Sequence, residues 1–341
     1  MKAAGKVIHD YQSFDKYKFP NKKSILRKQK RMSNLKQIIC FDTAIDKEYD
    51  FKTKQTCFDP NIEEMIHEKK EDIIHYPVSQ LEIIDEQNGI ECRDTNDVLQ
   101  FLLVPRLTSI HECGKKKTME TLQFLRKNRP QLKRGQARKN NFYNNEHSYV
   151  VFGKTTNRFG KGSIMSELKN DPNNFFKNRI TKMMRSMERK VKMYLDPRLL
   201  NTLSYVKNEL IEYDTICNSA MKPCQIWTSL SHAVNYHSAC HVDEDFFLSS
   251  CSVNEDNGED YNMKSKVITY FCFPTLNKAI ALRDGDILIF NPLTIHCCSK
   301  KVMTISNDVH IYSMYLKSKH VSLNDNATEL TTLQKQYLDN I

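Results

Sequence analysis

The sequence predicts an α+β protein whose C-terminal half is a jelly roll, preceded by helices and by a long, irregular, basic N-terminal part. Short apolar runs rich in β-branched and aromatic residues recur toward the C-terminus. They span residues 267–274, 279–282, 287–290 and 309–316. Turn residues such as Asp284-Gly285 separate them, and none of the runs has a helical period. Several short strands joined by hairpin turns are typical of a double-sheet jelly roll.

An amphipathic helix is predicted immediately before the jelly roll, over residues 175–195. Apolar side chains recur there at helical spacing, and the opposite face is rich in Lys and Arg, so we expect one face to pack on the core. The apolar positions are Phe176, Ile180, Met183, Met184, Met187, Val191 and Leu195. Asp196-Pro197 ends this helix, and a second one is expected over residues 197–216 with proline in its first turn.

Charge divides the rest of the chain. Residues 1–36 hold 11 Lys and Arg against two Asp, and residues 41–97 hold 16 acidic side chains against six basic ones. Residues 115–139 hold 10 Lys and Arg against one Glu. We therefore expect a basic flexible arm, then an N-terminal extension with a basic linker within residues 113–163, then the jelly-roll domain and a tail. The expected boundaries are 1–36, 37–163, 164–320 and 321–341.

The overall composition limits the kinds of partner and the location that are expected. The formal net charge is +10, which favours attraction to polyanions, and the two basic segments are either solvated surface or contacts to nucleic acid. No apolar stretch approaches the roughly 20 residues of a membrane helix, and no secretory signal is evident. An intracellular location, nuclear or cytoplasmic, is the expectation. The 11 cysteines are never spaced Cys-x-x-Cys, so buried thiols are expected rather than disulfides or small zinc sites.

Three residues of the predicted jelly roll carry the candidate chemistry. His241 and Asp243 are separated by one residue, so in an extended segment both side chains point the same way. His296 follows the apolar strand 287–290 and can complete a set of three. Two imidazoles and one carboxylate on one face of an octahedral ion leave three positions open, as in non-haem Fe(II) oxygenases. Merely satisfied polar residues in a jelly roll are the alternative reading of the same three side chains.

At these residues the chain resembles the Fe(II)/2-oxoglutarate-dependent dioxygenases, whose core is a double-stranded β-helix. The resemblance rests on His241-Val242-Asp243, on Gly285-Asp286 ahead of an apolar strand, and on His296. It covers about the last third of the chain and is closest to divergent protist members of the TET/JBP-like branch. It implies Fe(II) held by His241, Asp243 and His296, helices buttressing the barrel, and oxidation of a substrate for which a nucleobase is the first candidate.

The resemblance also implies a cosubstrate site, for which this sequence departs from the family pattern. An Arg or Lys is expected on the last core strand to receive the far carboxylate of 2-oxoglutarate, but that strand offers His310, Tyr312 and Ser313. Lys300 and Lys301 lie shortly after His296. The candidate cosubstrate residues are therefore Tyr236, His310, Ser313, Lys300 and Lys301. A catalytically silent jelly roll that binds nucleic acid through its basic segments is the competing functional hypothesis.

Overall fold

The structure is a computed structural model, and it describes the strands of the barrel, one long helix and the segments that join them. The described residues are 36–40, 47–50, 55–58, 78–94, 99–105, 149–156, 162–164, 175–195, 200, 226–227, 229–238, 240–241, 243, 245, 248–255, 266–302 and 308–315.

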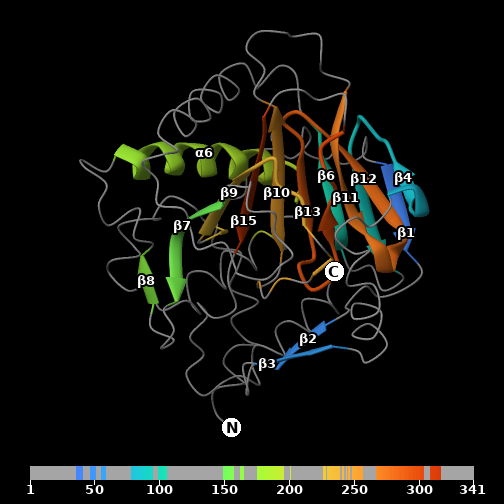
Figure 1. Ribbon diagram of the computed structural model, residues 1–341, viewed down its shortest axis with the longest axis horizontal. Helices are drawn as coiled ribbons and strands as arrows, with labels where there is room; N and C mark the ends of the chain where they lie inside the picture. Colours follow the sequence, from blue (N-terminus) through green and yellow to red (C-terminus); the bar gives the residue numbers. More distant parts are fainter. Residues whose placement is uncertain are drawn as a thin grey trace, which may run out of the picture.

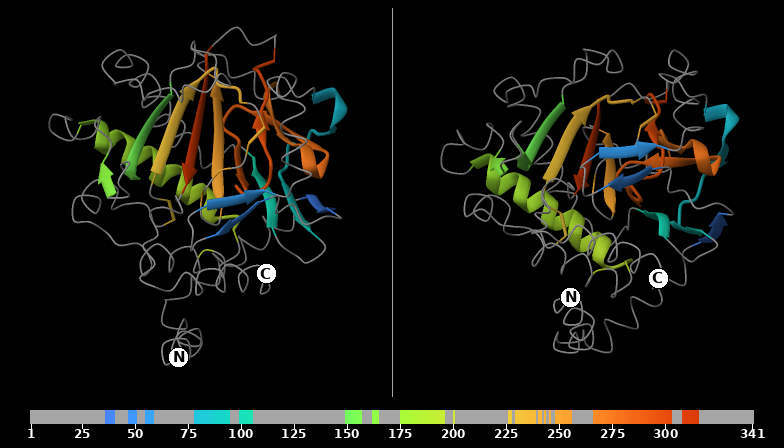
Figure 2. Two further views of the ribbon diagram at one scale, coloured as in Figure 1. Left: turned by 60° about the horizontal axis from the view of Figure 1, so that its bottom comes forward. Right: turned by 90° about the horizontal axis from the view of Figure 1, so that it is seen from below.

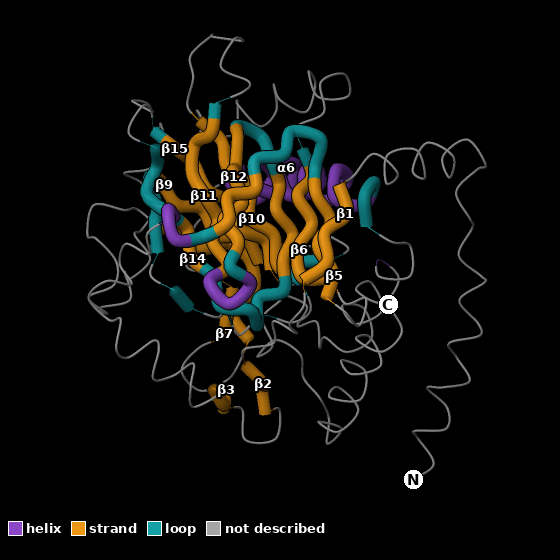
Figure 3. The backbone as a smooth tube through the Cα atoms, turned by 90° about the vertical axis from the view of Figure 1, so that its right-hand side faces the viewer, coloured by secondary structure: helices purple, strands orange, loops and turns teal. Residues whose placement is uncertain are grey.

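The larger of two sheets that face each other has nine strands in the order β1-β5-β6-β13-β10-β15-β9-β7-β8. The N-terminal part of the chain supplies β1 (Lys36–Cys40), β5 (Ile90–Asp94), β6 (Leu99–Val104), β7 (Tyr149–Thr156) and β8 (Gly162–Ile164). The C-terminal part supplies β9 (Ser229–Val234), β10 (Ser249–Glu255), β13 (Ile287–Phe290) and β15 (Val309–Tyr315). Figure 3 shows β1, β5 and β6 side by side at one edge.

The smaller sheet has the order β14-β11-β12-β4. Its strands are β4 (Glu82–Ile84), β11 (Val267–Phe273), β12 (Lys278–Arg283) and β14 (Cys297–Cys298). An isolated bridge between His241 and His296 continues this sheet beyond β14. Apolar side chains from both sheets form one buried cluster between them, including Phe101, Phe271, Phe273, Phe290 and Ile311. Two facing sheets closed around an apolar interior make this a jelly roll, as the sequence predicts.

Two short segments stand beside these sheets. A short 3-10 helix η3 (Val78–Gln80) precedes β4, and a second, η8 (Pro274–Leu276), joins β11 to β12. Asn277, which closes that turn, has a φ of 53°, a left-handed conformation that asparagine tolerates better than most residues. A separate two-stranded sheet pairs β2 (Lys47–Asp50) with β3 (Gln55–Phe58).

Helix α6 (Phe175–Lys192) buttresses the larger sheet. Figures 1 and 2 show it running across the strands β9, β15 and β10, on the side away from β11 and β12. The predicted apolar positions Met183, Met184, Met187 and Val191 are buried, and so is Leu195 just beyond the helix. Among the described residues, no helix is long and apolar enough to cross a membrane.

The observed strands agree with the apolar runs of the sequence, and further strands form where none was predicted. β7 extends over Tyr149–Thr156 and pairs with β9, where the sequence predicted the end of a basic linker. β10 was not predicted, because its sequence SSCSVNE is mostly polar. It lies between β13 and β15 in the larger sheet, and all of its residues are buried. The second predicted helix (197–216, apart from residue 200), the basic arm (1–35) and the basic run 115–139 lie outside the described residues.

Candidate metal centre

Backbone pairing brings the two predicted histidine ligands together. The amide of His241 donates to the carbonyl of His296 at 3.0 Å, and the amide of His296 donates to the carbonyl of His241 at 2.9 Å. The two residues are therefore a hydrogen-bonded antiparallel pair. Their rings lie 4.5 Å apart between centroids with a 55° tilt. A residue that follows an apolar strand is thus placed beside one that lies more than fifty positions earlier in the sequence.

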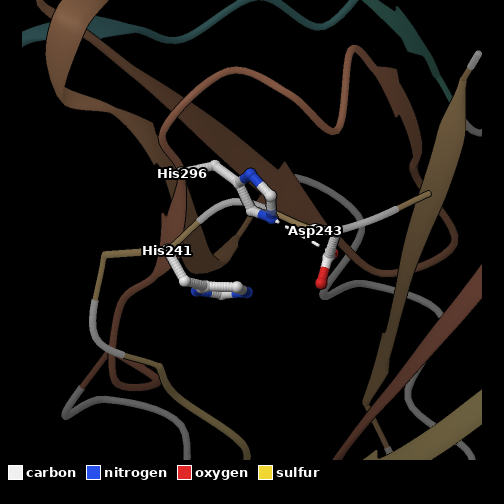
Figure 4. Close-up of side chains that lie close together, drawn as sticks. All are labelled: His241, Asp243 and His296. Atoms are coloured by element: carbon white, nitrogen blue, oxygen red, sulfur yellow. Dashed lines mark ion pairs between the residues drawn. The ribbon is translucent and has the colours of Figure 1, made fainter. Parts of the chain in front are cut away.

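Asp243 completes the group. Its amide donates to the carbonyl of Pro292 at 2.9 Å, which ties this position to the loop ahead of His296. One carboxylate oxygen, Oδ2, lies 3.4 Å from Nε2 of His296. In Figure 4 the His241 and His296 rings and the Asp243 carboxylate converge on one space. Among the described residues, these three form the one group of His, Cys, Asp and Glu side chains whose donor atoms all lie within 4.8 Å of one another.

The hydrogen bonding of His296 shows that the group fits a cation. Its Nδ1 lies 2.8 Å from the carbonyl oxygen of Thr294. A carbonyl can only accept, so Nδ1 donates, and in the neutral form of the ring Nε2 then presents a lone pair. That lone pair faces a carboxylate oxygen at 3.4 Å, an arrangement that a cation between the two atoms stabilises. Ligand bonds of about 2.1 Å at right angles place neighbouring donor atoms about 3 Å apart, so the residues fit a metal ion.

The surroundings of the triad are apolar on one side and open on the other. The His296 ring stacks on Phe271 at 5.4 Å and meets the edge of Phe290 at 4.8 Å. The His296 side chain is 3% exposed, whereas that of Asp243 is 35% exposed. A metal ion held here has protein behind His296 and access for other ligands from the side of Asp243. The sequence placed Phe271 and Phe290 in apolar strands but did not identify them as neighbours of the site.

The candidate cosubstrate residues do not converge on one point as the three candidate metal ligands do. Tyr236 follows β9 and packs, half-buried, against the apolar cluster between the sheets. Lys300 is exposed and Lys301 is half-buried, both in the segment after β14.

The structure does not bring His310 to the triad. Its neighbours along β15, Val309 and Ile311, lie in the cluster between the two sheets, so alternation turns His310 to the opposite face. There it is 1% exposed, and its Nδ1 lies 3.0 Å from Nε2 of His232. Receiving a cosubstrate carboxylate would require His310 on the other face of the strand.

Ser313 lies on the inner face of β15 instead. It is paired across the strands with Cys251 of the interior cluster, and the two side chains are hydrogen-bonded. Strand alternation places His310 and Ser313 on opposite faces, and the strand register agrees. The face that turns inward is the one that carries Ser313.

Thiols surround the centre without belonging to it. Burial raises the pKa of Cys298 to about 12 and raises the pKa of Cys251 well above its ordinary value. Hydrogen bonds to Cys240 and Cys272, followed by burial, raise the pKa of Cys297. None of these thiols belongs to the group of converging ligand atoms that the described residues form.

Comparison with known proteins finds chains of similar structure but none of similar sequence. No family model matches the chain, and no curated protein matches it. The structure of NgTET1 in complex with 5mC DNA is similar over 80% of this chain and 98% of the other, with a TM-score of 0.49 and 11% identity. A prolyl-4-hydroxylase from Pseudomonas putida is similar over 64% of this chain and 92% of its own, with a TM-score of 0.36 and 8% identity.

A third solved structure is the viral collagen prolyl hydroxylase of Paramecium Bursaria Chlorella virus-1 in its 2OG complex. It covers 58% of this chain and 89% of its own, with a TM-score of 0.29 and 13% identity. At identities this low, the functional interpretation rests on the geometry of the triad.

Proposed function

We propose that this protein is a non-haem Fe(II) oxygenase with 2-oxoglutarate as its cosubstrate. The observation that carries the proposal is the convergence of three ligand atoms, with Nε2 of His296 lying 3.4 Å from the Asp243 carboxylate and His241 beside both. Two imidazoles and one carboxylate on one side of an ion leave the other side for small ligands, which is the donor set of this class of enzyme.

The residues of the chain have separate tasks in this proposal. His241, Asp243 and His296 hold the ion, and the Thr294 carbonyl fixes the His296 ring in the tautomer that presents Nε2 to it. Phe271 and Phe290 cover the ring and exclude water behind it. When bound, Fe(II) and 2-oxoglutarate supply the activation of O2 that oxidises a C–H bond.

The fit to 2-oxoglutarate is less complete than the fit to the metal. The inner face of β15 offers Val309, Ile311 and Ser313, which is one hydroxyl and no cation within that described strand. A buried carboxylate needs a donor, so Tyr236, Ser313 and the two lysines after β14 are the candidates. The cosubstrate is therefore tested directly and apart from the metal.

The substrate class follows from charge. The net charge of +10 and the basic segments 1–36 and 115–139 favour a polyanion, and nucleic acid is the first candidate. An oxygenase acting on a base takes a single-stranded or flipped-out nucleotide, so single-stranded DNA and RNA are the substrates to test first.

The central experiment measures succinate formed from 2-oxoglutarate by Fe(II)-loaded protein, with and without single-stranded DNA or RNA. We expect turnover that requires Fe(II), and Asp243→Ala as the matched control should lose it. Turnover that nucleic acid stimulates would support the substrate class. No turnover in protein that binds Fe(II) stoichiometrically would contradict the cosubstrate assignment.

A deletion separates the polyanion contact from the chemistry. Removing residues 1–36 should weaken binding to DNA or RNA and flatten its salt dependence, because fewer phosphates are neutralised. Metal binding should stay unchanged. An unchanged salt slope would argue against nucleic acid as the partner of this arm. Protein that binds nucleic acid and no divalent metal would instead be the catalytically silent jelly roll.

A further inference from the structure

We propose that Cys240 and Cys297 are a redox-responsive pair, which hydrogen peroxide closes to a disulfide that weakens metal binding at the neighbouring triad. The pairing stands on the arrangement of the thiols alone. Its effect on the metal rests on the proposed metal centre.

Three thiols form a row on the outer face of the smaller sheet. Cys272 of β11 lies directly opposite Cys297 of β14, and Cys240 belongs to the same small cluster on that face. The Cys297 thiol, in the middle, is hydrogen-bonded to both of the others. Cys298, one residue further, lies in the separate cluster between the sheets, as strand alternation requires.

Backbone pairing places Cys240 opposite Cys297. His241 and His296 exchange both backbone hydrogen bonds, and the amide of Ser238 donates to the carbonyl of Cys298, so Cys240 lies between these bonds and faces Cys297. Cys272 also lies opposite Cys297, across β11. Opposed residues of antiparallel strands have Cα atoms about 4.5 to 5.5 Å apart, within the range that a disulfide spans. Pairing therefore allows both partners, and exposure selects Cys240.

Exposure sets the order of the chemistry. Cys240 is half-buried, whereas Cys297 is 3% exposed and Cys272 is fully buried. The Cys240 sulfur attacks one peroxide oxygen, the O–O bond breaks, and Cys240 becomes a sulfenic acid while one water leaves. The Cys297 sulfur then attacks the Cys240 sulfur, the S–O bond breaks, and the Cys297 proton leaves with that oxygen as the second water. Two thiols lose two electrons and two hydrogens, and one peroxide is reduced to two waters.

The pair is coupled to the metal centre through the backbone. Cys240 precedes the ligand His241, and Cys297 follows the ligand His296. Forming an S–S bond of about 2.05 Å pulls two hydrogen-bonded thiols together and shifts the strands that carry both imidazoles. Metal coordination tolerates displacements of about 0.2 Å, so the oxidised form should bind the ion less tightly.

Pairing is tested on metal-free, full-length protein by mass spectrometry after peroxide treatment and alkylation. We expect the loss of two hydrogens in wild type and in Cys272→Ser and Cys298→Ser, and no such loss at this site in Cys240→Ser or Cys297→Ser. Cys298→Ser is the matched control, because it removes the adjacent thiol on the other face. A disulfide that survives Cys240→Ser and disappears in Cys272→Ser would overturn the assignment, and so would the absence of any disulfide at Cys297.

The metal effect is measured by Co(II) titration after the peroxide has been removed. Oxidised wild type should bind Co(II) at least about 10-fold more weakly than reduced wild type, in the range of a disturbed ligand support, and dithiothreitol should restore the affinity. Peroxide should not change the affinity of Cys240→Ser. Equal affinity in both redox states would overturn the coupling, whereas reduced protein that binds no Co(II) would refute the metal centre instead.

Discussion

In the part of the chain that the structure describes, two pairs of histidines from neighbouring segments lie in contact, and they differ in what surrounds them. His241 and His296 face a carboxylate, and one side of the group is open. His232 and His310 lie on the face of the larger sheet turned away from the interior cluster, 4% and 1% exposed, and their rings stack 5.3 Å apart. One ring nitrogen of each is used in a bond to the other. The nearby carboxylate and the exposure of one side distinguish the candidate metal site from the buried pair.

The sharpest test of this comparison removes one side chain from the candidate metal site and one from the buried histidine pair. Asp243→Ala or His296→Ala should lower Co(II) affinity at least about 100-fold, because losing a ligand exceeds the cost of losing a supporting hydrogen bond. His232→Ala is the matched control and should bind Co(II) as wild type does. Isothermal titration calorimetry measures both, and an equal loss in His232→Ala would remove the distinction between the pairs.

The second test measures stability, for which the buried pair should matter more than the candidate metal site. His310→Ala should lower the free energy of unfolding by about 2 to 3 kcal/mol, because it opens a cavity and leaves the buried His232 nitrogen without this hydrogen bond. His241→Ala, half-buried, should cost less than about 1 kcal/mol in metal-free protein. Urea unfolding of both variants gives the comparison. A larger loss in His241→Ala would show that the triad is structural.

The cosubstrate gives a third contrast between the two faces of β15. Ser313→Ala should raise the dissociation constant of 2-oxoglutarate about 10-fold, the effect of one hydrogen bond to a charged group, while His310→Ala leaves it unchanged. Competition titration on Co(II)-loaded protein measures both constants. If His310→Ala weakens the binding of 2-oxoglutarate and Ser313→Ala does not, the inward face of β15 has been assigned wrongly.

The smallest expected effect concerns the aromatic rings that cover each pair. Phe271 stacks on His296, and Tyr312 stacks on His232 at 4.8 Å. Phe271→Leu should lower Co(II) affinity about 3-fold, because a looser His296 ring is less well oriented for the ion. Tyr312→Leu should leave Co(II) affinity unchanged. Equal effects would mean that the stacking acts on the fold and not on the ligand.

The sequence predicts the local part of this arrangement and not the part that depends on distant strands. Apolar runs predict β11, β12, β13 and β15, because a run of apolar side chains indicates a buried strand. β10 is not predicted, because its serines are buried through the position of the strand between β13 and β15 and not through an apolar character of their own.

The same limit applies at the site. Alternation separates His310 from Ser313, but the face of β15 that turns inward is decided by the opposite sheet. The His241–Asp243 spacing and the distal His296 predict a metal set from sequence alone. The cysteine row needs three strands to be assembled before its members become neighbours.

The position of β6 next to β13 has a consequence for how the chain acquires its structure. Leu103 pairs with Leu288, and β4 pairs with β12 in the other sheet. Contacts between residues so far apart close large loops, and a high contact order slows folding. During synthesis β5 and β6 can form their hairpin early, but its free edge waits for β13 to emerge. An exposed strand edge is prone to pair wrongly, so the yield of folded protein should depend on temperature and on chaperones.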